Sequence, residues 1–224
     1  MSELVLVRHG QASFGQADYD RLSPLGHEQA SRLGEALAAQ GFAPDRVFRG
    51  AQRRHRETLD GMAPALGLDP QHAVVHEGLN EFDASALLAA RFPGGLSEEE
   101  RRDRRTYFRI LRETVIAWQK DEVDSPPESF SAFTARVLAA RDAMLAASEA
   151  ADGPVLAVSS GGAISRLLAD ALRAPAEQMI LLQLQMKNCA VSRLVGGPDA
   201  RYLHAFNETP HMRERADARL LTYA

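Results

Sequence analysis

The chain has 224 residues, of which 45% are hydrophobic and 25% are charged, a balance typical of a soluble globular protein with a sizeable core. Its net charge of -4 gives no reason to expect a nucleic acid or an acidic membrane as partner, and no apolar run approaches the roughly 20 residues of a membrane span. Its single cysteine, Cys189, excludes an internal disulfide, and no cleavable leader follows Met1, so we expect a cytoplasmic protein.

The first predicted element is a buried strand, Leu4-Val5-Leu6-Val7, which ends abruptly in Arg8-His9-Gly10. After a loop rich in glycine, serine and aspartate, Ser23-Pro24 is typical of a helix N-terminus and Gly41 of a helix end. The pattern that follows predicts a strand at 45–48, a helix at 51–66 and a short strand at 74–75.

Residues 82–128 differ in character from the rest of the chain. A Pro-Gly-Gly break at 93–95 is followed by the charged run EEERRDRR and by ILRETVIAWQ, whose apolar residues recur at helical spacing. We interpret the charged run as an exposed helix face with i,i+4 ion pairs. The whole segment is predicted to be a helical insertion that forms a lid.

The last part of the chain returns to alternating elements. It predicts an amphipathic helix at 129–147, the strand VLAVSS from Val155, a helix after Gly161-Gly162 that Pro175 ends, and two strands around a turn at 196–199. Alternating strands and helices indicate a mostly parallel sheet, and the final hairpin adds one antiparallel edge strand. We expect residues 1–224 to form a single α/β domain, a three-layer α/β/α sandwich.

Two loops at the carboxyl ends of predicted strands carry the candidate chemistry, because ligands of parallel sheets gather there. One is Arg8-His9-Gly10. The other is Ser159-Ser160-Gly161-Gly162, where amides at a helix N-terminus favour an anion. A histidine between an arginine and an anion cradle is a candidate nucleophile for phosphoryl transfer. The alternative is an ordinary histidine that ends a strand.

Five blocks resemble, in order and spacing, the histidine phosphatase superfamily: LVLVRHGQAS, YDRLSPLGHEQASRLG, RRHRETL, LNEF and VLAVSSGGAI. That superfamily includes the cofactor-dependent phosphoglycerate mutases. The resemblance runs from the first strand to the last and is weakest between residues 82 and 128. It implies a phosphoglycerate mutase-like fold and catalysis through a phosphohistidine.

The resemblance assigns roles to individual residues. His9 matches the histidine that is phosphorylated, and Arg8 matches the arginine that binds the phosphate. Arg54, four residues before Thr58, matches the arginine of the motif S-P-L-x-R-x-x-x-T, although Gly50-Ala51 replace its Ser-Pro. For the run RRHR, the alternative is a solvated basic helix face.

Glu81 in LNEF matches the family's general acid. A carboxyl group can serve as this acid because a partly dry pocket raises its pKa and lets it keep a proton near neutral pH. The alternative is an exposed loop glutamate, of which Glu77 is an example. The residues expected to bind phosphate are Arg8, Arg54, Ser160 and Gly161, with Gln11 and Ser13 as further candidates.

Ser160 stands where the family's V-S-H-G-G block has a second histidine. Loss of one preorganised donor lowers a rate by roughly 10²–10³, so we expect weakened catalysis. His211, after the last strand, is a candidate replacement, although such a histidine is more often a surface residue. A serine nucleophile at Ser160 is a weaker alternative, because Val158 stands where the elbow G-x-S-x-G has its first glycine.

The sequence therefore predicts a phosphomonoester hydrolase that acts on a small phosphorylated substrate or a phosphopeptide. Two alternatives stay open: a phosphoglycerate-type mutase, and a pseudoenzyme that binds phosphate or a protein partner without turnover. We expect no cofactor and no metal, because arginines can supply the positive charge and the remaining histidines lack metal-ligand spacing.

Overall fold

A computed structural model describes residues 2–13, 20–197 and 201–223. Within these residues, six strands form one sheet in the order β3-β2-β4-β1-β5-β6. Their bounds are β1 (Ser2–Arg8), β2 (Arg46–Arg49), β3 (Val74–Val75), β4 (Val155–Ser159), β5 (Val191–Gly196) and β6 (Arg201–Glu208). The first four strands pair in parallel, whereas β5 is antiparallel to β1 and to β6. The antiparallel pairing thus lies at one edge, as predicted, with β5 itself one strand in from the edge.

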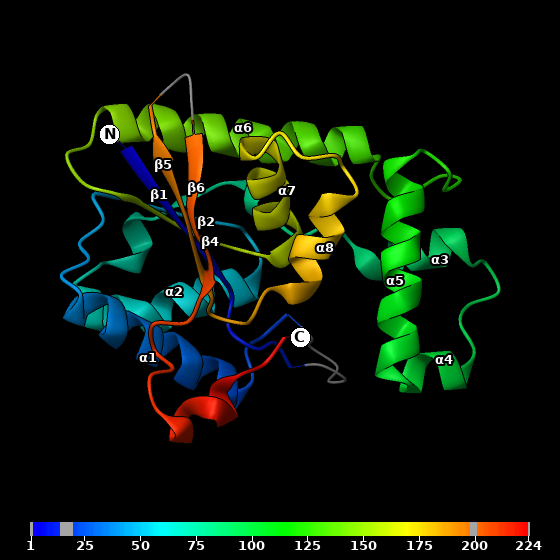
Figure 1. The fold of residues 1–224 in the computed structure, drawn as a ribbon, viewed down its shortest axis with the longest axis horizontal. Helices are drawn as coiled ribbons and strands as arrows, with labels where there is room; N and C mark the ends of the chain where they lie inside the picture. Colours follow the sequence, from blue (N-terminus) through cyan, green and yellow to red (C-terminus); the bar gives the residue numbers. More distant parts are fainter. Residues whose placement is uncertain (1, 14–19, 198–200, 224) are drawn as a thin grey trace.

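Helices cover both faces of the sheet, which confirms the α/β/α sandwich (Figure 1). One face carries α1 (Pro24–Ala39) and α2 (Arg53–Leu66), and the other carries α6 (Phe130–Glu149) and α7 (Gly161–Ala171). The sequence did not predict α8 (Gln178–Gln185), which follows α7. Three short 3-10 helices in the described part of the chain complete these layers: η1 (Pro70–His72), η2 (Glu77–Leu79) and η3 (Arg215–Leu220).

The central strand β1 divides the core in two, because successive strand side chains point to opposite faces of a sheet. Leu4 and Leu6 pack in the cluster that contains α6 and α7, while Val5 and Val7 pack in the cluster that contains α1 and α2. All four side chains are buried, and each burial stabilises the fold by about 1.5–3 kcal/mol. The tip of β1 is therefore held firmly from both faces.

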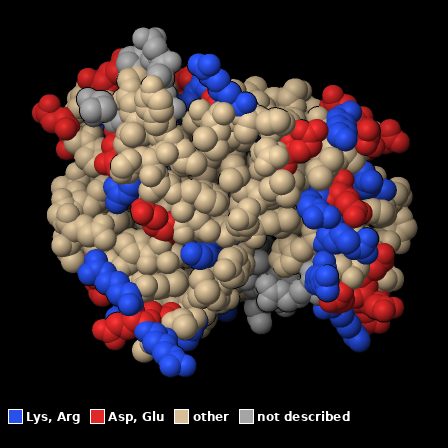
Figure 2. All heavy atoms as spheres, viewed as in Figure 1, with Lys and Arg blue, Asp and Glu red and all other residues tan. Residues whose placement is uncertain are grey.

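The segment 82–128 is helical, as predicted, and contains α3 (Ala84–Arg91), α4 (Glu98–Arg102) and α5 (Arg104–Gln119). Trp118 anchors α5, since its ring packs against those of Phe82, Phe130 and Phe133. An i,i+4 ion pair joins Glu98 to Arg102, and both signs of charge are interspersed over this part of the surface (Figure 2). None of the helices in the described residues is long and apolar enough to cross a membrane.

Candidate active site

His9 lies at the tip of β1, beside the end of β4, and its amide donates to the carbonyl of Ser159 (2.9 Å). The side chain is 5% exposed, and Nδ1 lies 2.7 Å from the carbonyl oxygen of Gly10. Because a carbonyl only accepts, Nδ1 carries the proton and Nε2 keeps its lone pair. Burial, and then the nearby Arg54 and Arg8, lower the pKa of His9 well below its usual value. The imidazole is thus neutral and nucleophilic at neutral pH.

Two arginines beside His9 are held by partners of their own. Arg54, on the first turn of α2, is buried; its Nη1 pairs with Asp20 (2.6 Å) and its Nη2 donates to Oε1 of Gln52 (2.8 Å). Arg8 donates through Nη1 to the carbonyl of Tyr223 (2.7 Å). Guanidinium groups fixed in this way are preorganised for the oxygens of a phosphoryl group.

Thr58 accounts for the spacing of the arginine motif. Its hydroxyl accepts a hydrogen bond from the amide of Gly10 (3.0 Å) and donates to the carbonyl of Arg54 (2.7 Å). One buried threonine therefore ties the loop of the nucleophile to the helix of the arginine.

Glu81 follows η2, and its carboxyl group lies at the N-terminus of α7. Its Oε2 accepts from the amide of Gly162 (2.9 Å), and its Oε1 accepts from the amide of Phe82 (3.2 Å). A Cβ at position 162 would lie 2.1 Å from Oε1, so the site needs a glycine there. Burial raises the pKa of Glu81 above its usual value, against the opposing effects of the Gly162 amide and the two arginines. The group keeps a proton to higher pH than an exposed glutamate does, as a general acid requires.

This arrangement corrects one part of the predicted anion cradle. The amide of Gly162 donates to the carboxyl group of Glu81 and is therefore engaged within the protein. Gly161 lies against the side chain of Arg8, whose Nε is 3.6 Å from the position of a Cβ at 161. Ser160 begins α7 without capping it, and its hydroxyl lies between Arg54 and His55. Phosphate binding by Ser160 and Gly161 stays a prediction.

A pocket of about 340 Å³ brings four predicted residues together: Arg8, His9, Arg54 and Glu81. The rest of its wall comes from the helical segment 82–128, α8 and the C-terminus, and is mainly apolar: Phe82, Ala84, Tyr107, Phe108, Leu111, Gln183, Leu184 and Tyr223. Over the part of the chain that the structure describes, no cluster of three or more His, Cys, Asp or Glu side chains is arranged to hold a metal.

Three further candidates do not line this pocket. The side-chain oxygen of Gln11 accepts from the hydroxyl of Ser23 (2.8 Å), at the start of α1. Ser13 is buried, and its amide bonds to the carbonyl of Arg21 (2.9 Å). His211 lines a separate hollow between α1 and η3, where burial lowers its pKa to about 4. Its position does not support a role as replacement for the second family histidine.

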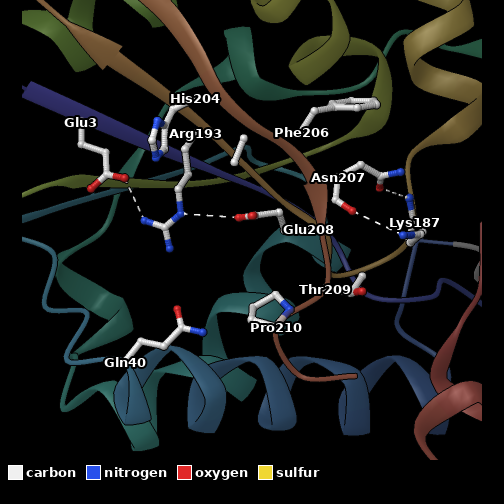
Figure 3. A pocket seen from close by; sticks show the side chains of 11 residues that line it. Glu3, Gln40, Lys187, Arg193, His204, Phe206, Asn207, Glu208, Thr209 and Pro210 are labelled. Atoms are coloured by element: carbon white, nitrogen blue, oxygen red, sulfur yellow. Dashed lines mark hydrogen bonds and ion pairs between the residues drawn. The ribbon is translucent and has the colours of Figure 1, made fainter. Parts of the chain in front are cut away.

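A larger hollow, of about 730 Å³, lies at the β5–β6 edge (Figure 3). Arg193 in this hollow pairs with Glu3 (2.8 Å) and Glu208 (3.9 Å), and Nζ of Lys187 donates to the carbonyl of Asn207 (3.5 Å). Its charges are thus balanced within the hollow, and its walls contain none of the predicted catalytic residues. The smaller pocket is the candidate active site.

A model of the histidine phosphatase superfamily (branch 1) matches residues 4–209. The chain belongs to this superfamily. Among its relatives is the 2,3-bisphosphoglycerate-dependent phosphoglycerate mutase of Mesorhizobium japonicum, 32% identical over 143 residues, which are 60% of this chain and 64% of that protein. The match therefore spans less than two thirds of that relative. The corresponding mutase of Rhizobium rhizogenes is 29% identical over 190 residues, 81% of this chain and 84% of that protein.

Solved structures share the histidine phosphatase fold. Mycobacterial glucosyl-3-phosphoglycerate phosphatase is 24% identical, with a TM-score of 0.67 over 93% of this chain and 100% of that one. A phosphoserine phosphatase of Entamoeba histolytica, in complex with phosphoserine, is 18% identical, with a TM-score of 0.66 over 95% of this chain and 100% of that one. At these identities the similarity shows the fold alone.

Sequence reasoning missed several residues of this histidine phosphatase site. Asp20 and Gln52 anchor Arg54, and Tyr223 anchors Arg8, yet no local spacing links these residues to the motifs. His55 is fully buried, and its ring centroid lies 5.8 Å from that of His9. The one signal for His55 was its place beside Arg54 in the run RRHR.

The buried histidines His9 and His55 predict a loss of stability in acid. Burial is the main cause that lowers the pKa of each in the folded protein, whereas an unfolded chain takes up these protons near pH 6.5. The free energy of unfolding should therefore fall as the pH drops below about 6.5, by up to about 1.4 kcal/mol per pH unit for each histidine. This fall should end once the folded protein also takes up the protons.

Urea unfolding between about pH 7.5 and pH 5.5 measures this slope. His55→Phe keeps a buried ring without a titrating group, and should make the slope shallower by about one proton. A variant with the slope of the parent protein would contradict the assignment of His55 as a buried neutral histidine.

Proposed function

We propose that this protein hydrolyses phosphomonoesters in two steps, through a phosphohistidine at His9. The observation that carries the proposal is the shared pocket. It combines a neutral imidazole, two anchored arginines and a carboxyl group whose pKa is raised by burial. A nucleophile, a binding site for anionic oxygens and a general acid are the parts that this reaction needs.

In the first step, the lone pair on Nε2 of His9 attacks phosphorus, and the bond from phosphorus to the ester oxygen breaks. The leaving oxygen takes the proton of Glu81 and departs as an alcohol. Arg8 and Arg54 hold the phosphoryl oxygens, while the carbonyl of Gly10 stabilises the charge that develops on the imidazole through Nδ1.

In the second step, the carboxylate of Glu81 removes a proton from a water molecule as the water oxygen attacks phosphorus. The bond between phosphorus and Nε2 breaks, and its electron pair returns to the imidazole. Inorganic phosphate leaves, and both His9 and Glu81 regain their starting states. The lid helices and α8 enclose the site on one side. This enclosure limits side reactions in which the phosphoryl group passes to other acceptors.

The lining of the pocket favours hydrolysis over mutase chemistry. Among its described lining residues, the cations are Arg8 and Arg54, and the proposed reaction uses both to hold a single phosphoryl group. A mutase must also hold the second anionic group of a bisphosphate. The lid instead presents Tyr107, Phe108 and Leu111, which favour a substrate with an apolar alcohol.

We therefore expect phenyl phosphate and 1-naphthyl phosphate to be better substrates than 3-phosphoglycerate. Burial of one aromatic ring against the lid is worth about 1.5–3 kcal/mol, so kcat/KM should differ by roughly 10–100-fold. Phe108→Ala should lower kcat/KM for the naphthyl ester and leave that for methyl phosphate nearly unchanged. Parallel steady-state assays of released phosphate test this; a preference for 3-phosphoglycerate would contradict it.

The alternative function is that of a pseudoenzyme, which binds phosphate or a protein partner without turnover. Incubation of the purified protein with an aryl phosphate, beside His9→Ala, separates the two functions. Phosphate release that disappears in His9→Ala supports the hydrolase. A folded protein that binds inorganic phosphate but releases none from the ester would overturn the hydrolase proposal.

A further inference from the structure

Behind the candidate active site, His55 and Ser160 form a buried pair. Nε2 of His55, on the first turn of α2, lies 2.7 Å from Oγ of Ser160 at the start of α7. Both residues are fully buried, so packing holds the pair in one geometry. The same Oγ is 3.4 Å from Nη2 of Arg54, which lines the pocket. The pair thus touches the phosphate-binding machinery directly.

Two departures from the family motifs meet at His55. Ser160 replaces the second histidine, and the small side chain leaves room for the imidazole of His55 beside it. Gly50 replaces the serine of S-P-L, and a Cβ at this position would lie 2.1 Å from Nδ1 of His55. The family serine at position 50 would thus collide with the His55 ring, and the 2.7 Å contact puts that ring directly beside the side chain at position 160. The two substitutions and His55 are therefore parts of one structural change.

The hydrogen-bond partners of His55 and Ser160 determine which ring nitrogen of His55 carries its proton and where the hydroxyl of Ser160 donates. Arg54 has only donors, so Oγ of Ser160 accepts from it. Among the described residues, Nδ1 of His55 has no hydrogen-bond partner. A buried N–H without an acceptor is costly, so the ring proton belongs on Nε2, where it donates to Oγ. Oγ then accepts from His55 and from Arg54, and its own proton is left to donate to another acceptor.

We propose that His55 is a positioning residue for phosphoryl transfer and that it acts through Ser160. By donating to Oγ of Ser160, His55 directs the hydroxyl proton of Ser160 away from α2 and toward the phosphoryl oxygens that Arg54 holds. The same hydrogen bond fixes Oγ as the acceptor for Nη2 of Arg54. The pair replaces the donor that the missing histidine supplies elsewhere in the superfamily. This inference rests on the proposed function and adds to it a residue at an unspecified position of the arginine motif.

A double-mutant cycle tests whether the pair acts as a unit. His55→Phe keeps the ring and removes its nitrogens, and Ser160→Ala removes the hydroxyl. Each should lower kcat by about 10²-fold, the effect of losing one preorganised donor. The double variant should also lose about 10²-fold, because the second change removes nothing that remains. Losses that multiply to about 10⁴-fold, or a His55→Phe variant within twofold of the parent, would overturn the proposal.

Two measurements separate this inference from the proposed function. Ser165→Ala is the matched control, since Ser165 is a buried serine on the same helix, and it should keep the parent kcat. Binding of inorganic phosphate, followed by titration calorimetry, should weaken at least tenfold in both single variants and equally in the double variant. If the parent shows no turnover, the proposed function fails, and the phosphate cycle still decides the role of His55.

A pair of variants that moves the imidazole from position 55 to position 160 gives an independent test. Ser160→His alone should be less active than the parent, because the new imidazole and His55 compete for the same space. Ser160→His combined with His55→Ala should recover activity well above that of the single variant. A Ser160→His protein more active than the parent would show that His55 does not occupy the place of the missing histidine, and would contradict the proposal.

Discussion

Replacement of His9 by alanine is expected to abolish turnover. The imidazole is the nucleophile of the proposed reaction, and loss of a nucleophile lowers kcat by a factor on the order of 10⁴–10⁶. Arg8 and Arg54 keep their own partners, Tyr223 for one and Asp20 with Gln52 for the other. His9→Ala should therefore still bind inorganic phosphate while its kcat for phenyl phosphate falls to the background rate.

His72→Ala is the control for this experiment, because His72 is an exposed histidine of η1. It should retain the parent kcat and KM. A His9→Ala protein with substantial turnover would mean that another group attacks phosphorus, and Ser160 would be the first to test. Thermal unfolding of each variant shows whether the loss comes from chemistry or from an unfolded protein.

Glu81→Gln is expected to have the second largest effect, and the size of the effect should depend on the leaving group. An alkyl alcohol needs a proton to depart, so kcat for an alkyl phosphate should fall by about 10²–10⁴-fold. A nitrophenolate leaves without protonation, so the first step with 4-nitrophenyl phosphate should slow far less. Presteady-state measurement of released alcohol for both substrates tests the prediction.

The raised pKa of Glu81 also sets the direction of the pH dependence. Burial keeps the carboxyl group protonated to higher pH than usual, and the first step with an alkyl ester should slow once the pH rises above that pKa. Glu77→Gln, a change at an exposed glutamate four positions earlier, is the matched control. Equal losses for alkyl and nitrophenyl esters in Glu81→Gln would contradict a general-acid role.

Much of the fold follows from local signals. The Ser23-Pro24 start of α1 and the glycine after α2 mark helix ends through short-range hydrogen bonds and backbone conformation, and the structure has both. The alternation of buried residues in β1 follows from strand geometry. By contrast, the sequence does not predict α8, because Pro175 is typical of a helix end and the apolar run after it is short.

In the candidate site, too, some residues are predicted from the sequence and others are not. Arg54 and Thr58 are predicted from the resemblance to the family's arginine motif, and Thr58 does link Arg54 to Gly10. The contact of His55 with Ser160 joins positions 105 residues apart, and no pattern in one sequence reports such a contact. The engagement of Gly162 by Glu81 was missed for a related reason: a helix N-terminus binds whichever anion the fold brings to it.

Trapping of the phosphoenzyme shows directly whether His9 attacks phosphorus. The protein is mixed with phenyl phosphate and quenched in alkali, and the site of modification is read by mass spectrometry and ³¹P NMR. We predict an acid-labile phosphoryl group on Nε2 of His9, because Nδ1 donates to the carbonyl of Gly10. An acid-stable phosphoserine at Ser160, or turnover with no phosphohistidine at His9, would contradict nucleophilic attack by His9.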